Sequence, residues 1–327
     1  MAHGIWRKAS TQAYSLKFPQ HELQKNTEKG TTLNQECRAG IFSCNIHKPD
    51  LLALVAFLLL TIAFTLSMSA IAQTVPKLND TGLEQCYDNT TAVTCASVAT
   101  DTGTHPRQDA RHGRDAKNTA GTLAKIGAGS KAFDYTKVCN SGDLAGTGTC
   151  SANPSLGTTA SDWACTKDNV TGLVWEIKTA INTDLRFSGH NYTWYSANIA
   201  TNGGVAGDTG SNTCNATLPS SLCNTDAFVT AVNATTLCGN SDWRLPNVLE
   251  LQSLIDYAKT GVSSPAVDTA LFPGTIADAF YWSNTTRSFS IGLAYTVGTA
   301  ATVVFPDNKT NSPNAGLHSV RLVRGGL

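Results

Sequence analysis

Apolar residues in this chain first form one long uninterrupted run and later recur with short periods. Residues 51–66 contain only apolar side chains and threonine, and the small residues Ala70 and Ala72 follow. Lys48 precedes the run. A basic residue, an apolar stretch and a small-x-small site are typical of a secretory signal peptide. We therefore favour cleavage after Ala72, and the alternative is an uncleaved anchor, because the run approaches the ~20 residues that span a bilayer.

Residues 1–50 are too many for the basic head of a signal peptide. Either the true start lies downstream of Met1, or these residues are a cytoplasmic tail, as their excess of Lys and Arg indicates for an anchor. Both interpretations place the chain after Gln73 outside the cytoplasm, in the periplasm, at the cell surface or secreted. We divide the chain into an extension at 1–50, a signal peptide or anchor at 51–72, a disulfide hairpin with an irregular wrapping segment at 73–120, and a main domain at 121–327.

Two helices are predicted in the main domain. The first is capped by Thr225 or Asp226 and carries apolar residues at helical spacing. The second begins at Asn247, where Glu250 three residues later indicates a capping box. Pro246 disfavours a helical conformation for the residue before it, so an extended corner is expected between the helices.

Strands are predicted on both sides of these helices. Alternating apolar residues predict a strand at 173–177, after a tight turn at 168–172. Further strands are expected at 133–138, 281–283, 288–297, 300–305 and 319–324. Long Gly/Ser/Thr loops separate them, and loops of that length are usually functional or cross-linked. The predicted fold class is α+β, with two helices packed on a twisted, mostly antiparallel sheet and long loops held by disulfides.

The ten cysteines support export. Cys37 and Cys44 precede the apolar run, and eight follow it. An even set in an exported chain indicates disulfides, although eight cysteines allow 105 connectivities. Local spacing suggests the pairs Cys86–Cys95, Cys139–Cys150 and Cys214–Cys223, which leaves Cys165–Cys238. A zinc site is disfavoured because the chain has no CxxC pair.

Charge and motifs exclude several function classes. The 24 basic and 24 acidic residues cancel, and no basic stripe is present, so we expect no nucleic-acid partner. The sequence contains no GxSxG, HExxH or Walker motif, so we expect no enzymatic activity.

Four ordered motifs resemble one family. They are Asp168–Glu176, Asp242–Pro246 with Glu250-Leu251, Tyr281–Ser283 and Val320–Gly326. Together they resemble the Lcl C-terminal domain family, named for the Legionella collagen-like adhesin. The resemblance covers roughly residues 105–327.

This resemblance implies an exported bacterial, surface-exposed binding module with a C-type lectin-like fold, which formylglycine-generating enzymes share. The named adhesin binds glycosaminoglycans, but this chain has no collagen-like repeat and is not basic, so we do not expect sulfated glycans as ligands. We expect carbohydrate or another adhesin-type surface ligand. One alternative is a structural component of the cell envelope without a ligand. The other is a formylglycine-generating-type oxidase, which would need reactive cysteines.

Candidate site residues fall into two groups. Trp243, Arg244 and Glu250 are expected to lock the corner together with Cys165–Cys238, because an arginine fork binds a carboxylate bidentately. The ligand-binding candidates lie in polar, loop-rich stretches, where binding residues concentrate. They are Trp194, Trp282, Asn284 and Arg287.

No cofactor is required by the sequence. Asp307 and Asn308 are weak candidates for Ca²⁺, which takes carboxylate and carbonyl oxygens, but no EF-hand pattern surrounds them.

Overall fold

We analysed a computed structural model of the chain. It describes residues 79–89, 91–95, 107–259, 265–300, 303–310 and 317–325. All of them belong to one compact unit, Ala72–Leu327. The expected extension at 1–50 and the signal peptide or anchor at 51–72 lie outside the described residues. Within those residues, no helix combines the length and the apolar character that crossing a bilayer requires.

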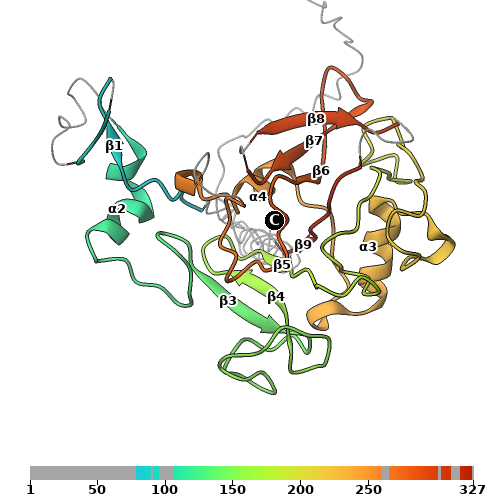
Figure 1. The fold of residues 1–327 in the computed structure, drawn as a ribbon, viewed down its shortest axis with the longest axis horizontal. Coiled ribbons are helices and arrows are strands. Elements are labelled where there is room, and N and C mark those ends of the chain that lie inside the picture. The colour runs from blue at the N-terminus through green and yellow to red at the C-terminus, as the bar shows by residue number, and fades with distance from the viewer. Residues whose placement is uncertain are drawn as a thin grey trace, which may run out of the picture. The chain divides into compact units, whose positions relative to one another are not determined.

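Two antiparallel sheets and one short hairpin form the β-structure (Figure 1). The four-stranded sheet has the order β3-β4-β5-β9, with β3 (Tyr135–Cys139), β4 (Trp163–Asp168), β5 (Val174–Glu176) and β9 (Val323–Arg324). The three-stranded sheet has the order β6-β7-β8, with β6 (Phe280–Thr286), β7 (Leu293–Gly298) and β8 (Val304–Asn308). The hairpin pairs β1 (Cys86–Tyr87) with β2 (Ala92–Val93).

Helices are few and short. The α-helices are α2 (Gly113–Thr119), α3 (Thr225–Ala234) and α4 (Val248–Gln252). Four 3-10 turns accompany them: η1 (Asp109–Arg111), η2 (Pro219–Ser221), η3 (Leu237–Gly239) and η4 (Tyr257–Lys259). The α+β class with antiparallel sheets is therefore confirmed for the described residues.

Three local predictions need correction. The segment expected to be irregular contains α2, whose polar sequence shows no apolar period. Helix α3 is capped by Asn224, whose Oδ1 accepts the Ala227 amide at 2.8 Å, and not by Thr225 or Asp226. The strand expected at 288–297 begins only at Leu293, because the Arg287 amide donates to the Leu293 carbonyl at 2.9 Å and closes a turn before it. The next strand is correspondingly β8 and not 300–305.

The apolar interior is divided into two clusters by strands that are buried on both faces. Successive strand residues point to opposite faces, so Tyr281 packs in one cluster and Trp282 in the other. Leu322 and Val323 divide in the same way. All three residues of β5 are buried, including Glu176, although the alternation that predicted this strand indicates one buried face only.

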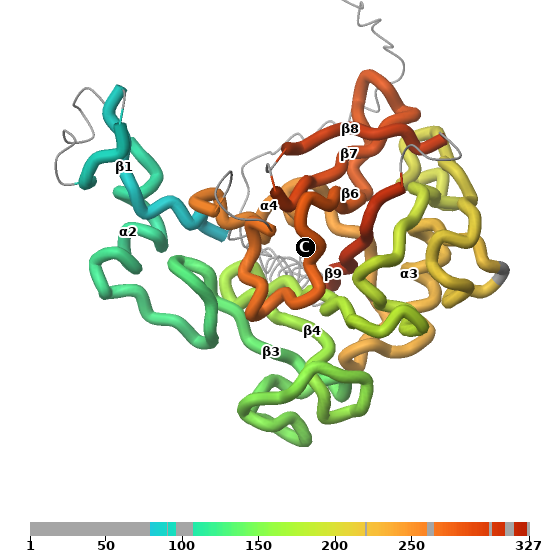
Figure 2. Tube along the Cα trace, in the orientation of Figure 1, coloured from blue at the N-terminus to red at the C-terminus, as the bar shows by residue number. Residues whose placement is uncertain are grey.

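The C-terminal segment 318–324 connects the two sheets (Figure 2). At its start, the Trp282 amide of β6 donates to the Ser319 carbonyl at 3.0 Å. Further along, the Glu176 amide of β5 donates to the Leu322 carbonyl at 3.0 Å. At its end, Val323 exchanges backbone hydrogen bonds with Arg244. One extended segment thus joins β6, β5 and the corner after α3.

Arg244 and Glu250 lock that corner. The guanidinium donates to both carboxylate oxygens, at 2.8 and 2.7 Å. Glu250 also accepts the Asn247 amide at 2.7 Å, while Asn247 Oδ1 accepts the Glu250 amide at 2.9 Å, which completes the capping box of α4. The fork raises the pKa of Arg244 above its usual value. The expected structural role of this pair matches its contacts.

Four disulfides cross-link the described residues, and they are the three pairs that local spacing suggested and the pair that remained. Three close short loops: Cys86–Cys95, Cys139–Cys150 and Cys214–Cys223. The fourth, Cys165–Cys238, spans 73 residues and ties β4 to η3.

Lys309 is a buried cation without a carboxylate partner among the described residues. Its Nζ lies 4.0 Å from the centre of the Trp194 ring. It donates to the Asn202 carbonyl at 2.8 Å and to Thr286 Oγ1 at 2.7 Å. Burial disfavours the charged form and lowers the pKa of Lys309 to about 8. Lys309 therefore holds the loop containing Asn202 against β6.

Replacing Glu250 is expected to destabilise the corner. Glu250→Ala removes the reciprocal half of the capping box and leaves the Arg244 fork without its carboxylate, so the free energy of unfolding falls by about 2 kcal/mol. Urea denaturation with the disulfides intact measures the loss. Glu250→Gln, which keeps one acceptor oxygen, serves as the matched variant and loses less. Equal stability of Glu250→Ala and the unchanged protein would contradict the structural role.

The two buried disulfides Cys165–Cys238 and Cys214–Cys223 differ mainly in loop length, 73 against 9 residues. In the chain-entropy model, replacing both cysteines by alanine costs about 4 kcal/mol for the long loop and about 2.5 kcal/mol for the short one. Denaturant unfolding of the two double variants tests this order. A larger loss for the short loop would show that strain or packing, and not loop closure, dominates.

Stability is expected to rise with pH above neutrality. The native pKa of Lys309 is about 8, against 10.5 for the free side chain, so the unfolded chain binds more protons between these values. From about pH 7.5 to about pH 9.5 this one group adds about 2 kcal/mol to the free energy of unfolding. Burial also lowers the pKa of Lys178 to about 8. Lys309→Met should therefore lose about half of the increase measured by urea denaturation, and an unchanged pH dependence would refute the assignment.

Candidate functional site

A hollow with a volume of about 320 Å³ opens between the loop that follows Tyr192 and the first turn of α3. The corner and the end of β6 complete its wall. Loop and helix contribute Trp194, Tyr195, Ser196, Asn198, Thr201, Thr225, Asp226 and Val229, and the corner and β6 contribute Arg244, Leu245 and Asn284.

Backbone pairing fixes the loop to the helix. The Thr225 amide donates to the Thr193 carbonyl at 3.0 Å. The Thr225 hydroxyl accepts the Tyr195 amide at 2.9 Å and donates to the Tyr195 carbonyl at 2.7 Å. Asn224, which caps α3, also donates to the Thr209 carbonyl at 2.8 Å. These bonds hold the rim of the hollow in place without a ligand.

The β6 side of the hollow is equally constrained. The Asn284 amide donates to the Pro246 carbonyl at 2.8 Å, and the Val248 amide donates to Thr285 Oγ1 at 3.0 Å. The end of β6 is therefore bonded to the start of α4, beside the Arg244–Glu250 fork.

Three polar side chains at this wall have no partner in the described part of the chain. They are the Tyr195 hydroxyl, the Asp226 carboxylate and the Asn284 amide. Each is at least partly exposed. Arg244, in contrast, is neutralised by Glu250. The hollow thus presents hydrogen-bond donors, hydrogen-bond acceptors and one uncompensated negative charge.

A second hollow of about 330 Å³ adjoins the first and shares Tyr195 and Asp226 with it. Its floor is the face of α3 that carries Ala227, Ala231 and Ala234. Residues at this spacing lie on one face of a helix, and their small side chains leave the floor shallow and apolar. We call the two hollows together the α3 groove. Each is at the lower end of the ~300–1,000 Å³ typical of ligand sites.

Two of the sequence-predicted ligand residues are almost fully buried, although one of them, Trp194, contributes to the lining of the first hollow. Trp194 is 2% exposed and Trp282 is 0% exposed. Their indole N–H groups donate to the carbonyls of Ser283 and Tyr192, both at 2.9 Å. Lys309 covers one face of the Trp194 ring. The polar neighbours in sequence suggested exposure, but these tryptophans point inward into the core.

The other two candidates differ from each other. Asn284 lines the α3 groove. Arg287 does not, since its guanidinium lies over the Phe289 ring at 5.1 Å. Tyr195 and Asp226 also line the α3 groove, although the sequence did not single them out as candidates. Tyr195 directly follows the candidate Trp194 in the sequence, whereas Asp226 was considered only as a helix cap.

Asp307 and Asn308 are engaged locally. Asp307 Oδ2 lies 2.7 Å from His318 Nε2, and Asn308 Oδ1 accepts the Thr310 amide at 3.0 Å. Burial lowers the pKa of His318, which disfavours its cationic form. Among the described residues, Asp307 belongs to no group of three His, Cys, Asp or Glu side chains that could hold an ion.

Trp243 is the remaining residue that was expected to lock the corner. Trp243 is 2% exposed, and its indole donates to the Leu237 carbonyl at 3.0 Å. Its backbone amide donates to Asn233 Oδ1 at 2.8 Å. Trp243 therefore packs the corner against the end of α3.

Comparison with known proteins identifies the part of the chain that contains the α3 groove. No curated protein and no solved structure gives a significant match. The family model of the Lcl C-terminal domain matches residues 164–324, which include the groove, the corner and both ends of the connecting C-terminal segment. Residues 164–324 of this chain therefore belong to the Lcl C-terminal domain family.

Proposed function

We propose that this domain is an exported binding module that holds a neutral carbohydrate in the α3 groove. The observation that carries the proposal is the set of unpartnered groups on a fixed concave wall: Tyr195, Asp226 and Asn284. Ligand sites typically combine apolar lining with a few placed polar groups. A sugar presents both hydroxyl groups and an apolar ring face, so it matches this wall.

The division of the groove supports a chain of sugar rings over a single one. Tyr195 and Asp226 lie where the two hollows meet. The first hollow offers the hydrogen-bonding groups, while the alanine face of α3 offers an apolar floor in the second. A ring in each hollow would place the connecting bond beside Asp226.

Charge favours neutral glycans over sulfated ones. Asp226 is the uncompensated charge of the groove, and the cation Arg244 is already bound by the Glu250 carboxylate. A sulfate group next to Asp226 would meet like charge. The ligand class of the collagen-like adhesin is therefore not transferred to this chain.

Disulfides and family membership support an extracytoplasmic location. Disulfides form and persist in oxidising compartments, and the described residues contain four of them. We propose a C-type lectin-like relationship for the fold, because two helices pack against antiparallel sheets and disulfides cross-link the long loops.

The two alternatives predict different behaviour. An envelope component without a ligand would leave the groove without a binding partner. A formylglycine-generating-type oxidase would need reactive thiols, and all eight cysteines of the described part are in disulfides. That pairing disfavours the oxidase and gives it a direct test by counting free thiols.

Binding is tested on an array of neutral and sulfated glycans, followed by calorimetry with the best neutral hit. Tyr195→Ala and Asp226→Asn are each expected to weaken binding at least about tenfold, since the first removes the ring and its hydroxyl and the second removes the charged acceptor at the centre of the groove. Arg287→Ala is the matched control, because Arg287 lies outside the groove.

The proposal fails if no glycan binds above background. It also fails if Arg287→Ala weakens binding as much as the two groove variants, or if sulfated glycans bind in preference and Asp226→Asn leaves their affinity unchanged.

A further inference from the structure

A second candidate site lies ahead of the Lcl C-terminal domain. Asp80 belongs to the extended segment before β1, Asp109 begins η1 and Asp115 lies in the first turn of α2. Their ligand oxygens all lie within 4.8 Å of one another. We call these three residues the aspartate cluster. It is the one group of three such side chains that the described residues contain.

Hydrogen bonds hold two of these carboxylates in position. Asp80 Oδ2 accepts the amides of Arg114 and Asp115, the latter at 2.8 Å. Asp109 Oδ2 accepts the Thr81 hydroxyl. Gly113 lies against Asp80. A Cβ added at Gly113 would come within 2.5 Å of Asp80 Oδ2, and the φ of +63° at this position also favours glycine. Such supporting contacts orient metal ligands, but they do not by themselves define a site.

The independent observation is an oxygen of Asp115. Asp115 is 0% exposed, and its Oδ2 accepts the Gly82 amide at 2.7 Å. Its Oδ1 is buried without any hydrogen-bond partner. A buried carboxylate oxygen without a donor carries a large desolvation cost and calls for an unseen partner such as an ion.

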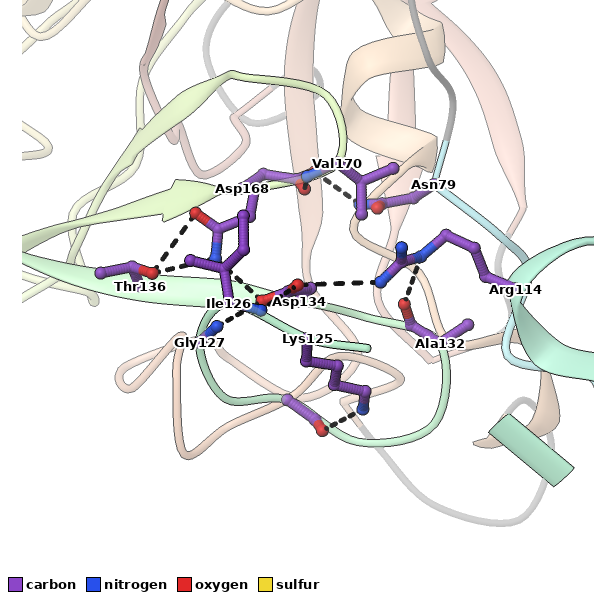
Figure 3. A network of polar contacts seen from close by, with 12 residues as sticks. Asn79, Arg114, Lys125, Ile126, Gly127, Ala132, Asp134, Thr136, Asp168 and Val170 are labelled. Carbon is purple, nitrogen blue, oxygen red and sulfur yellow. Dashed lines mark hydrogen bonds and ion pairs between the residues drawn. The ribbon is translucent and has the colours of Figure 1, made fainter. Parts of the chain in front are cut away.

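Nearby cations do not supply that partner. Arg114 directly precedes Asp115 in the sequence, but it donates to the Ala132 carbonyl at 2.9 Å and lies 3.8 Å from Asp134 (Figure 3). Lys125 donates to the Gly129 carbonyl at 2.9 Å (Figure 3). None of the ion pairs between described residues includes a member of the cluster.

The number and kind of the ligands favour Ca²⁺ over Mg²⁺. Ca²⁺ takes about six to eight oxygen ligands in a flexible geometry, and carboxylates are common among them. Mg²⁺ demands a nearly ideal octahedron, keeps several waters and is usually bound by only one or two carboxylates. We propose that Asp80, Asp109 and Asp115 form a Ca²⁺ site in the segment that precedes the Lcl C-terminal domain.

The site would fasten this segment to the main body. The residues on either side of Asp80 already bond to the main body. Asn79 donates to Asp168 Oδ2 at 2.6 Å, and the Tyr257 amide donates to the Thr81 carbonyl at 2.8 Å. The segment buries only a small apolar cluster that includes Cys86 and Ala110. Regions with so little core are commonly stabilised by disulfides or metals, and Ca²⁺ would join Asp80 to η1 and α2.

The test uses the full chain, freed of metal with EDTA and titrated with CaCl₂ in a calorimeter. We expect one Ca²⁺ per chain and a rise in Tm of about 5 °C at Ca²⁺ ~100-fold above Kd. Asp115→Asn should weaken binding at least tenfold. Asp109→Asn, at an exposed position, should do the same and covers the case in which Asp115→Asn does not fold.

Asp88→Asn is the matched control, because it makes the same change in the same segment outside the cluster. The proposal is overturned if no Ca²⁺ binds, if Asp88→Asn weakens binding as much as the cluster variants, or if Asp109→Asn and Asp115→Asn both retain full affinity. Preference for Mg²⁺ over Ca²⁺ in the same titration would also overturn it.

Discussion

The Arg244–Glu250 fork is the interaction on which the remaining architecture depends. It joins the chain that leaves α3 to the first turn of α4, and Arg244 pairs through its backbone with Val323. The carboxylate also completes the cap of α4. A charge-assisted, bidentate contact fixes orientation as well as distance. The corner can therefore serve as the point at which a helix, a sheet and the C-terminal segment meet.

Burial on both faces of the strands has a second consequence. Because the two apolar clusters lie on opposite sides of β5, β6 and the C-terminal segment, the large aromatic side chains are used as core. Trp194, Trp243 and Trp282 each find a backbone carbonyl for the indole N–H. Surface recognition is left to smaller polar side chains on the loops, which the core holds in position.

The α3 groove illustrates this division. Trp194 is anchored beneath the groove by Ser283 and covered by Lys309, and its neighbour Tyr195 presents the polar surface. The hydrogen bonds between Tyr195 and Thr225 fix the groove before any ligand arrives. A preformed site loses less conformational entropy on binding, which suits recognition of sugars whose individual contacts are weak.

Local sequence determined the features that depend on neighbouring residues: the α4 capping box, the turn at 168–172, the short disulfide loops and the family motifs. Tertiary structure alone decided which aromatic residue is exposed, because burial depends on partners far away in sequence, such as Ser283 for Trp194. It also placed Asp226 and Asn284 on the wall of the same hollow, and it brought Asp80 close to Asp109 and Asp115. Sequence spacing specifies local hydrogen bonds and loop closure, whereas a site assembled from distant segments exists only once the chain has packed.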